Sequence, residues 1–218
     1  MASLLLGAML GAALDAWAVL LPVSCAGCGA DDRALCLICR SALRPTLHRQ
    51  QLVDGMSVVS AVSYEKVARR AILAFKEQGR TDVARPLAAS FATAIASAVA
   101  GRVELVSIPA SRDGFRRRGY DPVRFLLRRA HLPRPSPVLS ASHERAHQKT
   151  LGRHERELNL AGSLAVTGQL AGRRFLLVDD VVTTGATLAE AARAVRDGGG
   201  EVIGAATLAF TPRYFGDS

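Results

Sequence analysis

The chain has 218 residues, 49% of them hydrophobic, and it carries 28 lysines and arginines against 19 aspartates and glutamates. This length and apolar content exclude a disordered or fibrous protein and fit one domain with a small appendage. The formal net charge of +9 favours an anionic partner. Nucleic acid, a phosphorylated metabolite and an anionic membrane surface all fit, and charge alone does not choose among them.

The first 22 residues form an apolar segment, "MASLLLGAMLGAALDAWAVLLP". A signal peptide should begin with Lys or Arg, but none occurs before Arg33, and a membrane span would have to carry Asp15. Apolar residues recur at intervals of three or four: Leu6, Leu10, Leu14, Trp17 and Leu21. This spacing predicts an amphipathic helix over residues 1–22 that docks on the protein body. Membrane or partner contact, for instance through the GxxxG of Gly7 and Gly11, is the alternative.

All the cysteines of the chain lie in one short window as two CxxC pairs, Cys25 with Cys28 and Cys36 with Cys39. Two such turns can direct four thiolates at one tetrahedral zinc ion, so residues 23–45 are predicted to form a structural zinc module. Four sulfur ligands leave no open position for catalysis. Two disulfides in an exported protein are the alternative, whereas a structural zinc fits a reducing cytoplasm.

From about residue 58 the sequence alternates between strand-like and helix-like segments. Strands are expected at 56–65, 103–109, 136–140, 173–180 and 201–210. Helices are expected at 66–79, 82–100, 122–130 and 187–199, with a basic loop at 110–121 and a polar loop at 143–159. Strands that alternate with helices predict an α/β domain over residues 55–213, with a mostly parallel sheet flanked by helices.

Ligands of such sheets bind beyond the carboxyl ends of the strands, where Asp179 and Asp180 follow the buried run at 175–178. Two adjacent acids repel each other, and vicinal sugar hydroxyls with Mg²⁺ nearby would compensate them. A small-residue loop could then hold a phosphate at the start of the next helix; it consists of Thr183, Thr184, Gly185, Ala186 and Thr187. Alternatively, the acids are solvated and Thr187 caps the helix with Glu190 as its capping-box partner, and both interpretations can hold together.

The stretch "FLLVDDVVTTGATL" resembles the phosphoribosyl pyrophosphate (PRPP) binding signature of type I phosphoribosyltransferases. The elements "CAGC…CLIC", "AFKEQG", "RRRGYD" and "HQKTLGRHERELNLAG" occur in the order found in the ComF family, phosphoribosyltransferase-like proteins named for a role in natural competence. This resemblance extends from about Leu14 to Phe210. It implies a type I phosphoribosyltransferase-like fold with an N-terminal four-cysteine zinc module, and PRPP with Mg²⁺ as ligands.

The resemblance also implies roles for individual residues. Asp179 and Asp180 would hold the ribose hydroxyls and act in catalysis, and residues 183–187 would hold the 5′-phosphate. Pyrophosphate would face Ala110, Ser111 and Arg112, with further positive charge from Arg116, Arg117 and Arg118. The family's Asn-Gln pair is replaced here by Asp121-Pro122. A flap would be formed by Arg145, Gln148, Leu151, Arg156 and Asn159, with Ala146 where the family has Thr.

Two questions stay open from the sequence. Lys76, in "AFKEQG", is either a phosphate ligand brought in from another element or a solvated lysine at a helix end. The reaction implied by the resemblance is displacement of pyrophosphate from the ribose C1 by a nitrogen nucleophile, and the sequence does not name this acceptor.

A second function competes with the transferase: a non-enzymatic or regulatory protein of DNA uptake that binds single-stranded DNA through its basic surface and contacts other competence proteins. Clusters at Arg69–Arg70, Arg116–Arg118 and Arg128–Arg129 could follow phosphates, with Phe115 and Tyr120 stacking on bases. The same arginines could serve solubility and pyrophosphate binding alone. Under either function we expect a cytoplasmic protein without a transmembrane span.

Overall fold

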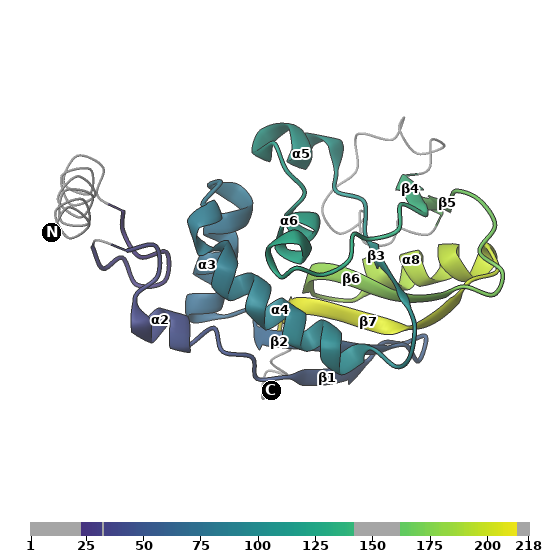
Figure 1. Ribbon diagram of the computed structural model, residues 1–218, viewed down its shortest axis with the longest axis horizontal. Helices are drawn as coiled ribbons and strands as arrows, with labels where there is room; N and C mark the ends of the chain where they lie inside the picture. The colour runs from purple at the N-terminus through teal and green to yellow at the C-terminus, as the bar shows by residue number, and fades with distance from the viewer. Residues whose placement is uncertain (1–22, 32, 142–161, 213–218) are drawn as a thin grey trace, which may run out of the picture.

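The computed structural model describes residues 23–31, 33–141 and 162–212 (Figure 1). The helix predicted over residues 1–22 lies outside the described residues. So does the predicted flap, which comprises Arg145, Gln148, Leu151, Arg156 and Asn159. Among the helices of the described ranges, none combines the length and the apolar character that crossing a membrane requires.

Five strands form the central sheet in the order β1-β2-β7-β6-β3. Their bounds are β1 His48–Gln51, β2 Ser57–Ser63, β3 Glu104–Ser107, β6 Arg174–Val182 and β7 Glu201–Phe210. The neighbours from β2 to β3 pair in parallel, and β1 pairs with β2 antiparallel at the edge. The prediction of a mostly parallel sheet within an α/β fold is therefore confirmed.

Helices cover both faces of this sheet. Their bounds are α3 Lys66–Glu77, α4 Ala84–Ala98, α6 Pro122–Arg129 and α8 Ala186–Asp197. The sheet separates two apolar cores: Leu176 and Val178 of β6 pack with α3, α4 and α6, while Phe175 and Leu177 pack with α8. All four of these β6 side chains are fully buried, as expected for a strand with a continuous apolar run between two helical layers.

The structure corrects three details of the sequence interpretation. The expected basic loop at 110–121 contains a helix, α5 (Arg112–Arg118), because Ser111 caps it by accepting a hydrogen bond from the Gly114 N–H at 3.1 Å. The strand β6 continues to Val182, so Asp179 and Asp180 lie within it. A second, antiparallel sheet joins β4 (Leu139–Ala141) to β5 (Leu164–Val166), and no strand was expected over the residues of β5. Figure 1 shows α5 at the top of the molecule, beyond α6.

Candidate functional site

The carboxyl halves of three neighbouring strands meet around the two acids. In the register of the sheet, Val178 pairs with Ser107, the last residue of β3, and Asp179 pairs with Thr207 of β7. The chain that follows β3 leads within four residues to Ala110 and Ser111, at the start of α5. Since parallel strands end at the same edge of a sheet, the acids and the segment after β3 share that edge, as the sequence predicted.

Asp180 has a counter-charge in the chain itself. The ammonium of Lys76, in the last turn of α3, lies 2.8 Å from Asp180 Oδ2, and the two side chains are 25% and 14% exposed. Burial, the largest single effect, lowers the pKa of Lys76, but the charge of Asp180, the hydrogen bond to it and the charge of Asp179 together outweigh burial, and the net pKa is raised. Lys76 is therefore ion-paired at the candidate site rather than solvated at a helix end.

Asp179 is less well compensated than its neighbour. Its carboxylate accepts a hydrogen bond from the Asp180 N–H at 2.8 Å. Burial, followed by the charge of Asp180, nevertheless raises the pKa of Asp179 to about 7, against the opposing effects of that N–H and of Lys76. The carboxyl pair therefore carries less than two full negative charges near neutral pH, and a ligand that offers hydroxyl donors or a cation would favour its ionised form.

The Thr-Gly loop leads directly into helix α8. Gly185 is the N-cap, with a left-handed φ of 84°, and the Ala186 N–H donates to Thr184 Oγ1 at 3.3 Å. A side chain at Gly185 would also collide with Leu52, because its Cβ would lie 2.5 Å from Leu52 Cδ2. The first N–H groups of a helix have no partner within it, so this loop presents donors suited to a phosphate, with Thr183 exposed beside them.

The alternative interpretation of this loop as a capping box is wrong. Gly185, rather than Thr187, occupies the N-cap position. Glu190 is buried and turned to other partners: Oε1 accepts from the Leu164 N–H at 3.1 Å, and both carboxylate oxygens accept from Arg193 at 2.8 Å. Glu190 thus ties α8 to strand β5 and does not reach back to the start of its own helix.

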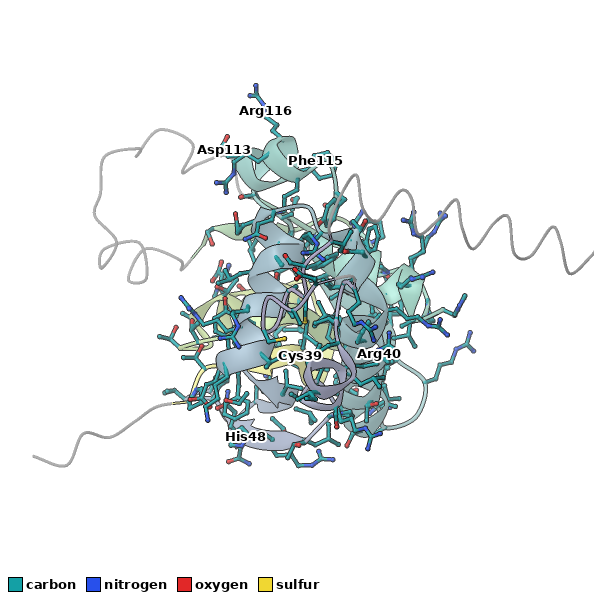
Figure 2. The ribbon with its side chains drawn as sticks, turned by 90° about the vertical axis from the view of Figure 1, so that its left-hand side faces the viewer. Cys39, Arg40, His48, Asp113, Phe115 and Arg116 are labelled. Carbon is teal, nitrogen blue, oxygen red and sulfur yellow. The ribbon has the colours of Figure 1, made fainter. Side chains whose placement is uncertain are left out.

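The arginine side chains of helix α5 differ in burial, as Arg118 and Arg116 show. Arg112 begins the helix and Arg118 ends it, before the left-handed Gly119 with φ 74°. The Arg118 side chain is only 10% exposed and lies 3.7 Å from Glu77 at the end of α3. Its Nε is the one buried side-chain polar atom without a hydrogen-bond partner among the described residues. Figure 2 shows Arg116 at the top of the molecule, pointing away from the body.

The four cysteines converge as predicted, and their Sγ atoms all lie within 4.8 Å of one another. Zn–S bonds of about 2.3 Å place two sulfurs of a tetrahedron about 3.8 Å apart. The Cys28 and Cys36 Sγ atoms are 3.7 Å apart. Burial opposes ionisation of Cys25, but backbone N–H groups, first that of Cys36, lower its pKa to about 6. All four thiols are free, and their arrangement fits a tetrahedral thiolate site, not the pair of disulfides.

Two residues of these sites were not singled out from the sequence: Leu52 contacts Gly185, and Glu77 pairs with Arg117 and Arg118. Glu190 was expected as a capping-box partner, and its contact with β5 was not. Each acts through a neighbour that is distant in the chain. No local pattern could have identified them, since a leucine before a turn and a glutamate on a helix are common.

Comparisons with known proteins point to one class. Residues 114–217 match the model of the family described as "Phosphoribosyl transferase domain". Over 90 residues the chain is 36% identical to the orotate phosphoribosyltransferase of Mycobacterium leprae, a stretch that covers 41% of this chain and 44% of that protein. The matched stretch thus spans less than half the length of this curated relative.

Solved structures of the same class are also similar to this chain. The orotate phosphoribosyltransferase of Mycobacterium tuberculosis H37Rv, in complex with Fe(III) dicitrate, is 22% identical with a TM-score of 0.35, covering 79% of this chain and 82% of that one. The orotate phosphoribosyltransferase of Aeropyrum pernix is 21% identical with a TM-score of 0.36, covering 80% and 78%. Residues 114–217 thus resemble a phosphoribosyl transferase domain, within an α/β fold that has a mostly parallel sheet and a four-cysteine cluster near its N-terminus.

Proposed function

We propose that the protein is a member of the ComF family that binds PRPP with Mg²⁺ at the carboxyl edge of its sheet. The observation that carries this proposal is the placement of a half-buried carboxyl pair beside the N-terminus of α8. Carboxylates accept hydrogen bonds from vicinal hydroxyls, and a helix start with small residues accepts a phosphate. A phosphorylated sugar offers both groups at once.

Different residues at this edge of the sheet would bind different parts of PRPP. Asp179 and Asp180 would accept from the ribose hydroxyls, and the loop at 183–187 would hold the 5′-phosphate. The pyrophosphate would lie toward the segment 110–112 and Arg118. The buried, unpartnered Nε of Arg118 supports a charged ligand on this side. Lys76, already at the carboxyl pair, would be close enough to share in binding the phosphates.

The proposed reaction transfers the phosphoribosyl group to an unidentified nitrogen acceptor. The bond between C1 and the pyrophosphate oxygen breaks, a bond from C1 to nitrogen forms, and the acceptor loses a proton. Mg²⁺ supplies positive charge to the leaving pyrophosphate when it is bound. The carboxylates of Asp179 and Asp180 would stabilise the positive charge that develops on the sugar, provided that both are ionised, which ligand binding favours.

Calorimetric titration of PRPP with Mg²⁺ tests the site directly. Replacement of both acids, Asp179→Asn with Asp180→Asn, should weaken PRPP binding on the order of 100-fold, since each hydrogen bond to a charged group contributes about 1.5 kcal/mol or more. Glu201→Gln is the matched control, because Glu201 is an acid at the opposite end of the same sheet. Equal affinity in the double variant and wild type would refute the site.

Turnover needs a separate measurement. Pyrophosphate release from PRPP, screened against a panel of nitrogenous bases and amines, should identify an acceptor. Binding of PRPP without release against any acceptor would favour a regulatory role for the same pocket and would reject the transferase activity.

We further propose that the cysteine module holds one structural Zn²⁺ and that the protein works in the cytoplasm. The convergence of the four Sγ atoms and the N–H groups directed at Cys25 and Cys36 support a thiolate-bound metal. Free thiols of this kind persist in reducing compartments. Metal analysis of protein purified under reducing conditions should give about one zinc per chain.

Binding of single-stranded DNA is a second candidate function, and one surface feature favours it. A cavity of about 350 Å³ is lined by Thr81, Phe125, Arg128, Arg129 and His131. An aromatic ring and two arginines in one cavity are suited to a base and its phosphates. If this surface binds DNA, Arg128→Ala with Arg129→Ala should weaken oligonucleotide binding and reduce its salt dependence, while PRPP affinity stays unchanged.

A further inference from the structure

Helix α3 contacts both the cysteine module and the carboxyl pair. Lys76, in its last turn, forms the ion pair with Asp180 at 2.8 Å. About two turns earlier, Val67 and Arg70 face the module. Figure 1 shows α3 rising beside α2 (Leu37–Ser41), the helix that carries Cys39. One helix of twelve residues therefore connects two sites that are far apart in the sequence.

The contacts at the module end are made by the first CxxC turn. Gly27 donates its N–H to Cys25 Sγ at 3.4 Å, and its carbonyl accepts a hydrogen bond from Arg70 Nε. The turn is held so closely that a Cβ on Gly27 would lie 2.5 Å from Cys39 Sγ and 3.1 Å from Val67 Cγ1. Just beyond α3, Arg80 donates to the Ser24 carbonyl at 3.0 Å. The backbone that bears the sulfurs is thus bonded to α3 and to the turn after it.

Packing joins the same two parts. Four apolar side chains of the module belong to the same buried core as one face of α3: Cys25, Leu35, Cys39 and Leu43 with Ala68, Ala71, Ile72 and Phe75. At the other end of α3, the Phe75 carbonyl accepts a hydrogen bond from Tyr120, next to Lys76. A change in the module would therefore act on α3 as a packed unit.

We propose that metal binding by the four cysteines positions α3, and that Arg70 is a positioning residue for the ion pair between Lys76 and Asp180. The metal joins the two CxxC turns, and without it the module loses the bonds that hold its core face against α3. The helix then orders less well at its last turn, and Lys76 is held less closely at the carboxyl pair. This proposal rests on the proposed PRPP site for its functional consequence, but its structural part does not.

Hydrogen exchange measured on the full chain tests the structural part without PRPP. We expect removal of zinc by a chelator to raise exchange across residues 23–43 and through α3 as far as its last turn at 74–78, and re-addition of Zn²⁺ to restore protection. Faster exchange confined to residues 23–43 would overturn the proposal, whether or not the protein binds PRPP.

Calorimetric titration of PRPP in excess Mg²⁺ tests the functional part. Arg70→Ala should weaken PRPP binding on the order of fivefold with zinc still bound, and Arg70→Lys, which keeps a donor, should restore part of the loss. Arg69→Ala is the matched control, since it removes the same charge from the adjacent position of α3. Equal effects of Arg69→Ala and Arg70→Ala would overturn the role of Arg70.

Two further readouts separate positioning from a general loss of stability. Coupling is reciprocal, so PRPP should slow zinc release to a metal indicator in wild type, and Lys76→Ala should abolish this effect and remove the influence of zinc on PRPP affinity. A zinc effect that persists unchanged in Lys76→Ala would overturn the proposal. If wild type binds no PRPP at all, the proposed function fails, and hydrogen exchange still decides the structural coupling.

Discussion

The cysteine module brings four thiols together, and the carboxyl edge of the sheet brings two carboxyl groups together. The two regions differ in the hydrogen bonds and counter-charges that stabilise these groups. In the module, backbone N–H groups point at the sulfurs and the four Sγ atoms surround one point. At the edge, the two acids differ from each other: Asp180 has the ammonium of Lys76, and the pKa of Asp179 is raised to about 7.

Under the proposed function, this difference would separate a structural metal from a ligand that binds reversibly. Four converging thiols, two of which are buried in the core, would fit an ion that stays bound. Two neighbouring carboxylates with only one nearby cation repel each other. Their repulsion destabilises the folded protein as long as no ligand is bound, which is common in binding sites. Substitutions in the two regions should therefore affect different properties, and their effects should differ in size.

The largest effect is expected at the module. Cys36→Ser removes one metal ligand but retains a good N-cap for α2, because a serine hydroxyl can accept the Cys39 N–H that Cys36 Sγ accepts now. We expect bound zinc to fall from about one per chain to almost none and residues 23–43 to lose protection from hydrogen exchange. Metal analysis checks this, and full zinc occupancy in the variant would contradict the four-cysteine site.

Gly185→Val should have the next largest effect, and for two structural reasons. Valine at a φ of 84° is strained, and its Cβ would lie 2.5 Å from Leu52 Cδ2. Together these should lower the free energy of unfolding on the order of 3 kcal/mol, and PRPP binding should be lost because the loop moves. Leu52→Ala in the same chain should recover part of the stability, as measured by denaturant unfolding. No recovery would mean that Leu52 is not the obstacle.

Substitution of each of the two acids should change the free energy of unfolding in opposite directions. At pH 8 we expect Asp179→Asn to raise the free energy of unfolding by about 2 kcal/mol, whereas Asp180→Asn should lower it by about 1 kcal/mol through loss of the pair with Lys76. The gain from Asp179→Asn should shrink below pH 7 and vanish near pH 4.

The sign of this pH dependence follows from linkage. The pKa of Asp179 is raised from its ordinary 3.8 to about 7, so in wild type the folded state binds an extra proton between these values and loses stability as the pH rises through them. The variant lacks this loss. Chemical denaturation at a series of pH values measures it, and a gain that is constant from pH 4 to 8 would contradict the raised pKa.

The smallest effect is expected at Thr187. Since Gly185 is the N-cap and Glu190 bonds Leu164 and Arg193, Thr187→Ala should change the free energy of unfolding by less than about 0.5 kcal/mol. Glu190→Gln is the comparison, because it weakens the contact of α8 with β5 and should cost more. A loss of 1 kcal/mol or more in Thr187→Ala, seen in denaturant unfolding, would restore the capping-box interpretation.

The sequence by itself determined the parts of the protein that depend on local pattern. The apolar run at 175–178 predicted a strand buried on both faces, and the alternation of segments predicted the parallel sheet. The spacing of the two CxxC pairs predicted the convergence of four sulfurs. Each of these features follows from the hydrophobic pattern or the cysteine spacing over a few residues. Such patterns can be recognised in the sequence without the tertiary structure.

Only the tertiary structure decided which distant residues meet. The pair of Lys76 with Asp180, the contact of Leu52 with Gly185 and the hydrogen bond from Arg70 to Gly27 each join elements that are well separated in the sequence. Such contacts depend on strand order, helix placement and side-chain packing, which no local pattern encodes. For the same reason, the sequence showed only that two acids are adjacent. The tertiary structure decided that Asp180 pairs with Lys76 and that burial raises the pKa of Asp179.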